Sequence, residues 1–295
     1  MNGRVVYDLT TLEGTMKGLA EYLNVDENTV EAYTESCDGE YSVDEFLEFI
    51  NVTEQELLNC ELSLVTLHVT TNNDKCNSIK EYGLLNLQES ITLDTPLSRY
   101  LKQKNILIDI ENKMIHYKGK SFDISEKFTK FNSFDDEKKQ NLTMLIYKLY
   151  EDYQINSFFG SDNVLDYGGY CNARPEFLFN LAEFLRDSSI EDDWISERNN
   201  STYIFKFKTA ISNCTDYTFF DEQEFALKKH ELEYLDAEEI EIKKRKWVIY
   251  QSLANIYDEN YRREYTCFLK FDVRVPFSDI IKIYSPEDYL QEYDI

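Results

Sequence analysis

The sequence predicts an α+β protein in which an acidic helical module precedes a mixed-sheet domain with helical insertions. Three observations support this class. The first 62 residues follow a helical pattern, runs of β-type residues recur through the remainder, and amphipathic helical stretches separate those runs. With 295 residues, 42% of them hydrophobic, the chain is long enough for one or two domains. We therefore expect a helical module over residues 1–62 and an α+β domain over residues 63–295.

The helical module contains an internal repeat. The segment Glu21–Val30 recurs 27 positions later as Glu48–Leu57, and each copy joins two apolar helix segments through an Asn-Val turn and an acidic cap. This pattern predicts tandem helix-turn-helix units, and the first copy looks like the helix-turn-helix of bacterial DNA-binding regulators. The module holds 15 acidic and 2 basic residues, so its own charge disfavours contact with phosphates. It is either a protein-interaction module or a helical subdomain that packs against the rest.

Net charge is the strongest compositional feature of the whole chain. A formal charge of −25 disfavours a general nucleic-acid-binding surface and favours a basic protein partner or mimicry of a nucleic-acid surface. The only dense basic cluster is Lys243–Lys246.

The six cysteines form no C-x-x-C pair, which fits a reducing cytoplasm. The sequence shows no signal-peptide core and no run of membrane-spanning length, so we expect a cytoplasmic protein without a membrane partner.

The α+β domain begins with its most informative segment. An apolar strand over residues 64–71 is interrupted by His68 and Thr70, a short helix with a polar start follows, and Gly83 suits the end of that helix. A histidine at a strand end, with a hydroxyl group two residues later, faces whatever lies above the sheet. The segment therefore predicts a ligand-facing imidazole.

The next segments predict the remainder of the mixed domain. A helix over 96–104 precedes a small β-meander over 106–124, and an amphipathic helix covers 135–155. Gly168 and Gly169 permit a tight turn before a helix that starts near Pro175. A strand over 203–209, a charged helical region over 221–257 and two strands over 268–284 complete the pattern.

The opening segment resembles the first motif of the ADP-ribosyltransferase superfamily, in the His-x-Thr branch that includes diphtheria toxin and the poly-ADP-ribose polymerases. The final strand, followed by a proline and an acidic turn, is similar to the end of small bacterial members. The resemblance implies an ADP-ribosyltransferase-like fold over residues 63–295, with NAD as substrate. It also implies that His68 fixes the nicotinamide ribose and that the backbone near Thr70 holds the nicotinamide amide.

The same chemistry requires an aromatic ring and a carboxylate, because the nicotinamide–ribose bond breaks towards a cationic oxocarbenium ion. Tyr167 and Tyr170, beside the glycine pair, are the candidates for stacking on nicotinamide. For the carboxylate, Glu222-Gln-Glu224 resembles the Glu-x-Glu of the arginine-modifying branch, with Glu224 at the cation and Glu222 near the acceptor. Glu239 and Glu241 form a second Glu-x-Glu, and a chain that lacks the catalytic carboxylate is a further alternative.

Other chemistries have no motif in the sequence. Phosphate-binding loops, nucleophile elbows and His-Glu-x-x-His metal motifs are absent, and three histidines far apart do not suit a His-rich metal site, so we expect none. The resemblance implies an intracellular bacterial toxin or phage-defence effector that transfers ADP-ribose from NAD to a protein or nucleic-acid acceptor. An antitoxin or another basic partner would then bind the acidic module. The alternative is a non-catalytic acidic protein, either an inhibitor or a nucleic-acid mimic.

Overall fold

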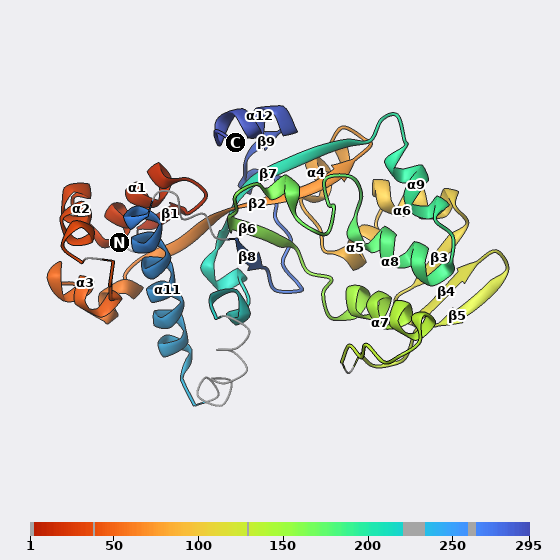
Figure 1. Cartoon of the computed structure of the whole chain (residues 1–295), viewed down its shortest axis with the longest axis horizontal. Helices are drawn as coiled ribbons and strands as arrows, with labels where there is room; N and C mark the ends of the chain where they lie inside the picture. The colour runs from red at the N-terminus through yellow and green to blue at the C-terminus, as the bar shows by residue number, and fades with distance from the viewer. Residues whose placement is uncertain (1–2, 38, 129, 221–233, 259–263) are drawn as a thin grey trace.

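A computed structural model of the chain describes residues 3–37, 39–128, 130–220, 234–258 and 264–295, and it has the expected mixed α+β architecture. A six-stranded sheet occupies the middle, a helical region lies at one end, and a lobe of helices and short strands lies at the other (Figure 1). Five strands follow the order β8-β6-β2-β7-β9, and β1 pairs separately with β2.

Strand β2 (Glu61–Asn72) organises the sheet because it pairs with three other strands, β1, β6 and β7. On one side it pairs along nearly its whole length with antiparallel β7 (Ser201–Ala210). On the other side, its first half pairs in parallel with β1 (Arg4–Asp8), and only Leu67 pairs with β6 (Asn156–Gly160). Strand β8 (Tyr265–Phe268) extends the sheet beyond β6, and β9 (Ile280–Tyr284) extends it beyond β7.

The first 60 residues are largely helical, as expected, but they also contribute strand β1 to the central sheet. Helices α1 (Leu12–Leu23), α2 (Glu27–Ser36) and α3 (Val43–Phe49) follow, then the 3-10 helix η1 (Glu54–Leu58). The side chains of Thr11, Asp26 and Ser42 accept the N-terminal amides of α1, α2 and α3. Because β1 and β2 share one sheet, the helical region continues directly into the fold of residues 63–295.

Helix α11 (Ala237–Tyr257) packs against these N-terminal helices and carries the basic cluster of residues 243–246. Lys244 pairs with Asp216, while Lys246 pairs with Asp44 and Glu54. Arg245 is buried, pairs with Glu241 and donates to the carbonyl oxygens of Leu57 and Cys60 at 2.6 and 3.1 Å. Three of the four basic residues therefore have partners within the protein, two of them in the N-terminal region, and these three do not form a free basic surface.

The lobe at the other end has its own apolar core. It contains the short helix α5 (Leu87–Thr92) and α6 (Pro96–Gln103), the meander β3 (Ile106–Asp109), β4 (Met114–Tyr117) and β5 (Lys120–Asp123), and helices α7 (Glu137–Tyr150), α8 (Glu176–Leu185) and α9 (Ser189–Ile195). Thr95 caps α6 and Pro96 occupies its first turn. The helix over 96–104 and the meander over 106–124 match the expectations from sequence.

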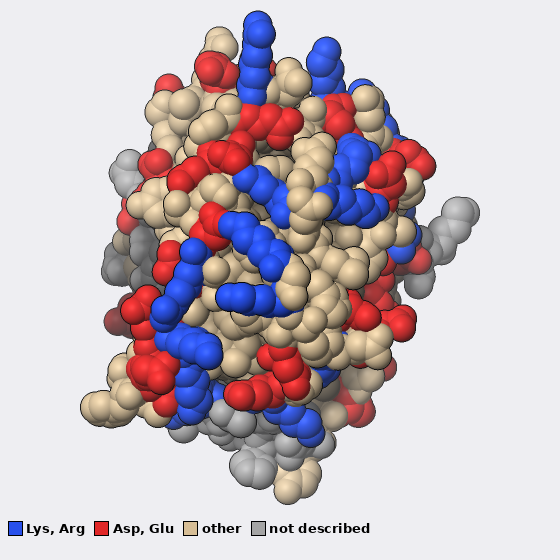
Figure 2. Space-filling model, turned by 90° about the vertical axis from the view of Figure 1, so that its right-hand side faces the viewer, with Lys and Arg blue, Asp and Glu red and all other residues tan. Residues whose placement is uncertain are grey.

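Charge is distributed unevenly between the two ends. The N-terminal region carries most of the excess of acidic residues, whereas the stretch 99–120 of the lobe holds six basic and two acidic residues. Figure 2 looks onto the lobe and shows basic side chains in a band among acidic ones.

Among the helices of the described ranges, none combines the length and apolar composition that crossing a lipid bilayer requires.

Two short helices complete the fold. Helix α4 (Asn77–Tyr82) follows β2 and ends at Gly83, whose φ of +81° lies in the region that favours glycine. An added Cβ at Gly83 would lie 2.1 Å from the carbonyl oxygen of Val275, so the close approach of these two segments also requires glycine. Helix α12 (Pro286–Glu292) covers β7 and β9 through a small third core that contains Tyr284 and Tyr289.

Candidate functional site

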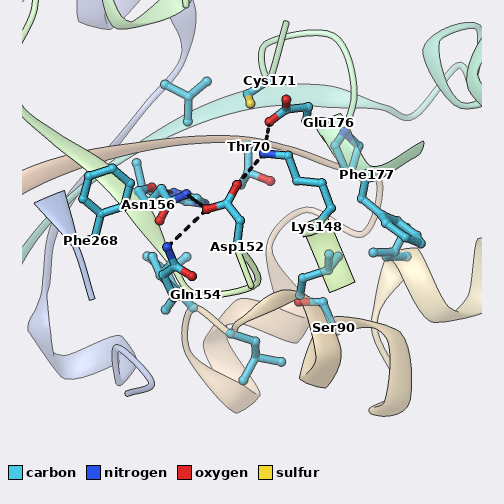
Figure 3. Close-up of a pocket in the computed structure, with 18 of the residues that line it drawn as sticks. Thr70, Ser90, Lys148, Asp152, Gln154, Asn156, Cys171, Glu176, Phe177 and Phe268 are labelled. Atoms are coloured by element: carbon cyan, nitrogen blue, oxygen red, sulfur yellow. Dashed lines mark hydrogen bonds and ion pairs between the residues drawn. The ribbon is translucent and has the colours of Figure 1, made fainter. Parts of the chain in front are cut away.

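A pocket of about 830 Å³ lies between the second half of β2 and the lobe. It begins where β6 separates from β2, since Leu67–Phe158 is the only registered pair between these strands. Side chains from β2, β6, β8, α7 and α8 line it, and Figure 3 shows part of this lining. Pockets of this size accommodate small molecules and cofactors.

His68 lines the pocket at the point of separation and is half-buried. Its Nδ1 lies 2.7 Å from the carbonyl oxygen of Asn156, which bridges the gap between the two strands. Burial lowers the pKa of His68 below its usual value, and the bond to Asn156 opposes this only in part, so the ring is neutral at pH 7. Because a carbonyl oxygen only accepts hydrogen bonds, the proton sits on Nδ1 and Nε2 is left as an acceptor.

Thr70 and Tyr167, two of the residues named from sequence as ligand-binding candidates, line the same pocket. The Tyr167 ring packs edge-on against Phe158 of β6, with ring centroids 5.3 Å apart. Its loop is anchored by the buried Arg174, which donates to the carbonyl oxygen of Gly169 at 2.5 Å. The aromatic ring is therefore presented by a loop that an internal cation holds in place.

Tyr170 has a different environment from Tyr167. It is 66% exposed, adopts a φ of +52° and lies with its ring 6.0 Å from the Arg174 guanidinium. It is not among the lining residues of the pocket. Of the two tyrosines considered from sequence, Tyr167 is the one that the fold brings beside His68.

The carboxylates expected from sequence do not line the pocket in the described part of the chain. Glu222 and Glu224 lie outside the described residues. Glu239 and Glu241 lie on α11, where Glu239 accepts from the backbone amide of Asp236 and Glu241 pairs with Arg245. Both contacts lie within α11 and its N-cap, and neither glutamate is among the residues that line the pocket with His68.

Glu264, which the sequence analysis missed, lines the pocket immediately before β8. Thr266 and Phe268 also line it, so alternate residues of this strand face the cavity. Glu264 is exposed, and in the described part of the chain no hydrogen bond or ion pair engages its carboxylate. An acidic residue directly before an apolar strand was the available signal, and among 56 acidic residues that signal is weak.

A polar cluster lies in the middle of the pocket (Figure 3). The ammonium of Lys148 lies 2.6 Å from carboxylate oxygens of both Asp152 and Glu176. Burial alone would lower the pKa of Lys148, but the two carboxylates outweigh it and raise that pKa above its usual value. The lysine is therefore a fixed cation whose charge is fully matched by its neighbours.

The Asp152 carboxylate also binds two amide groups. Its Oδ1 accepts from Asn156 Nδ2 at 3.0 Å and from Gln154 Nε2 at 3.2 Å. No local pattern indicated this cluster, since the amphipathic spacing over residues 135–155 predicts only a core helix. Cys171, also in the lining, is a thiol at neutral pH because burial, with a contribution from Glu176, raises its pKa to about 11.

The lining carries one lysine and four carboxylates, and so has a formal charge of −3 with His68 neutral. This combination suits a ligand with a cationic ring and hydroxyl groups, and it offers an acceptor nitrogen, an aromatic ring and an unpaired carboxylate. Comparisons of the chain with protein-family models, curated proteins and solved structures give no match. The geometry of the site is therefore the basis for assigning a function.

Proposed function

We propose that the protein cleaves NAD and transfers its ADP-ribosyl group to a protein or nucleic-acid acceptor. The observation that carries this proposal is the shared pocket of His68, Thr70, Tyr167 and Glu264. These residues come from three segments of the chain, with His68 and Thr70 both on β2. Together they offer the ribose-binding, ring-stacking and charge-stabilising groups that the reaction requires.

The charge of the pocket favours one end of NAD. The pyridinium ring is cationic, so a lining with a formal charge of −3 favours the nicotinamide end. Lys148 is matched by Asp152 and Glu176, so it is not a free partner for the pyrophosphate. The nicotinamide riboside moiety therefore belongs inside the pocket, with the phosphates towards the solvent.

In the proposed reaction, His68 Nε2 accepts a hydrogen bond from a hydroxyl of the nicotinamide ribose, and Tyr167 contacts the nicotinamide ring. The bond between C1′ and the pyridinium nitrogen breaks, and its electron pair leaves with neutral nicotinamide. Glu264 stabilises the positive charge that develops at the ribose. An oxygen or nitrogen nucleophile of the acceptor then bonds to C1′ and loses a proton to solvent or to a basic group.

Glu264 takes the role that the sequence analysis gave to Glu224. Glu264 suits this role because it lines the pocket with His68 and has no competing partner among the described residues. Glu222 and Glu224 remain predictions from sequence. The accompanying host role is that of a bacterial cytoplasmic toxin or phage-defence effector, with the acidic N-terminal region as the docking surface for an antitoxin or another basic partner.

The test is release of nicotinamide from NAD by the purified protein, with and without cell extract, together with transfer of labelled ADP-ribose to extract components. We expect His68→Ala and Glu264→Gln each to lower the rate on the order of a hundredfold or more. His116→Ala is the matched control, because His116 lies on the β4 strand of the meander and bonds to Ser121 outside the pocket.

A wild-type protein that neither binds NAD nor releases nicotinamide overturns the enzymatic proposal. The non-catalytic alternative would then be favoured by salt-sensitive binding to a basic protein that His68→Ala leaves unchanged.

A further inference from the structure

Asp152 lies at the centre of the polar cluster and makes contacts that reach the candidate catalytic histidine. It follows α7 by two residues and accepts from three side chains, namely Lys148, Gln154 and Asn156. Gln154 lies in the short connection that leads into β6, and Asn156 is the first residue of that strand. The carboxylate therefore ties the start of β6 to the end of α7.

The Asp152 carboxylate determines which way the Asn156 side chain points. A carboxylate only accepts hydrogen bonds, so the amide must turn its NH₂ group towards Asp152. The Asn156 Oδ1 is then buried without a hydrogen-bond partner among the described residues, and the same is true of Gln154 Oε1. An unpartnered buried acceptor is unfavourable, so the bonds to Asp152 are what hold the two amides in this orientation.

Asn156 also contacts His68 through its backbone. Its carbonyl oxygen accepts from His68 Nδ1 at 2.7 Å, beyond the last registered pair between β2 and β6. No further ladder pair between these strands fixes that carbonyl. Its position depends on the pairing of Asn156 with Phe268 of β8 and on the side-chain bond to Asp152.

We propose that Asp152 is a positioning residue that acts through Asn156 to hold His68 in the Nδ1–H tautomer, with Nε2 directed to substrate as an acceptor. Lys148 and Glu176 support Asp152 in this role. Lys148 binds the second carboxylate oxygen of Asp152, and Glu176 forms an ion pair with the same lysine. The catalytic consequence rests on the proposed function, whereas the effect on the tautomer does not. The two parts are therefore tested separately.

The tautomer is measured directly by ¹⁵N NMR of the imidazole nitrogens in the full-length protein. The chain has three histidines, so the His68 signals are assigned by their loss in His68→Asn. In the wild type at pH 7.5 we expect an Nδ1 signal typical of a protonated nitrogen and an Nε2 signal typical of an unprotonated one. In Asp152→Ala we expect both signals to move towards a mixture of the two tautomers.

The control for charge is Glu151→Gln. It removes one negative charge from the lining of the same pocket without removing a bond to Asn156, and we expect it to leave the His68 signals at their wild-type positions. Wild-type signals in folded Asp152→Ala overturn the proposal, and so does an equal shift in Glu151→Gln. If Asp152→Ala does not fold, Asp152→Leu, which has nearly the same shape but no acceptor oxygen for Asn156, is measured in its place and judged by the same criterion.

Kinetics test the catalytic consequence. We expect Asp152→Ala to lower kcat for nicotinamide release by at least about tenfold with a smaller change in KM, since the wrong tautomer removes an interaction made at the reacting ribose. A changed tautomer with unchanged kcat overturns the catalytic part alone. If the wild type shows no NAD cleavage, the proposed function fails, while the NMR result still decides the positioning role.

Discussion

The two halves of strand β2 have the same backbone conformation but opposite surroundings. The first half, residues 61–66, lies between β1 and β7, and its side chains are buried after Glu61. The second half, residues 67–72, keeps β7 but has only one registered pair on its other side. There, half-buried His68 and Thr70 alternate with buried Leu67 and Val69.

This difference shows how one strand serves both as core and as a site. Where both edges are paired, apolar side chains fill the space on both faces of the sheet. Where β6 departs, the gap holds the pocket, and a polar imidazole is tolerated because the Asn156 carbonyl satisfies its proton. Loss of one neighbouring strand therefore creates the candidate site.

The largest difference in stability is expected between alanine substitutions at Leu64 and at His68. Leu64 is fully buried in the main core, so Leu64→Ala should lower the free energy of unfolding by about 3 kcal/mol. His68→Ala should lower it by about 1 kcal/mol or less, while it lowers the rate of nicotinamide release on the order of a hundredfold or more. Urea denaturation of both variants measures this difference. Equal losses of stability would contradict the division of β2 into a core half, residues 61–66, and a half that borders the pocket, residues 67–72.

A second comparison of stability losses involves Gly83, which lines the pocket beside residues 67–72 of β2. Gly83→Ala introduces a Cβ 2.1 Å from the Val275 carbonyl oxygen at a positive φ, and we expect a loss of about 2–3 kcal/mol. Gly119→Ala is the matched control, because Gly119 also has a positive φ but has open space around its Cβ position. Its expected loss is about 1 kcal/mol. Thermal melts that rank the two variants equally would show that the close approach at Gly83 is unimportant.

The polar cluster beside residues 67–72 of β2 should contribute less to the free energy of unfolding than a core leucine does, but more than a surface ion pair does. Lys148→Met leaves Asp152 and Glu176 without their shared cation, and we expect a loss of about 2 kcal/mol at pH 7. Lys118→Met removes an exposed partner of Asp187, and we expect a clearly smaller loss of stability because solvent screens this pair. Chemical denaturation at low salt compares the two variants. A Lys148→Met protein with unchanged stability would argue against a tightly held Asp152.

The smallest expected effect is a pH dependence that originates at His68. Its pKa is lowered in the folded state, so the unfolded chain binds more protons below about pH 6.5. Stability should therefore fall as the pH drops from 7.5 to 5.5, by an amount set by how far the folded-state pKa of His68 lies below its unfolded value. His68→Gln should flatten this part of the profile. An unchanged slope would mean that His68 is not neutral and buried as described.

Local patterns were sufficient to predict many elements of this fold. Helix caps, the meander over 106–124 and the strand that carries His68 all depend on neighbouring residues, and all appear near the expected positions. Strand β1 was missed because it is five residues long and has a partner more than fifty positions away. Its two buried side chains, Val5 and Tyr7, are too few to set a period.

The sequence by itself determined the α+β class, the acidic N-terminal helices and the presence of His68 and Thr70 at the end of a strand, because these follow from local spacing and composition. Only the tertiary structure decided that Tyr167 rather than Tyr170 lines the pocket, and that Glu264 and the Lys148–Asp152 pair join His68 there. The reason is physical. Residues from β2, α7 and β8 meet only through strand order and register, and long-range pairing of this kind leaves no periodic trace in the chain.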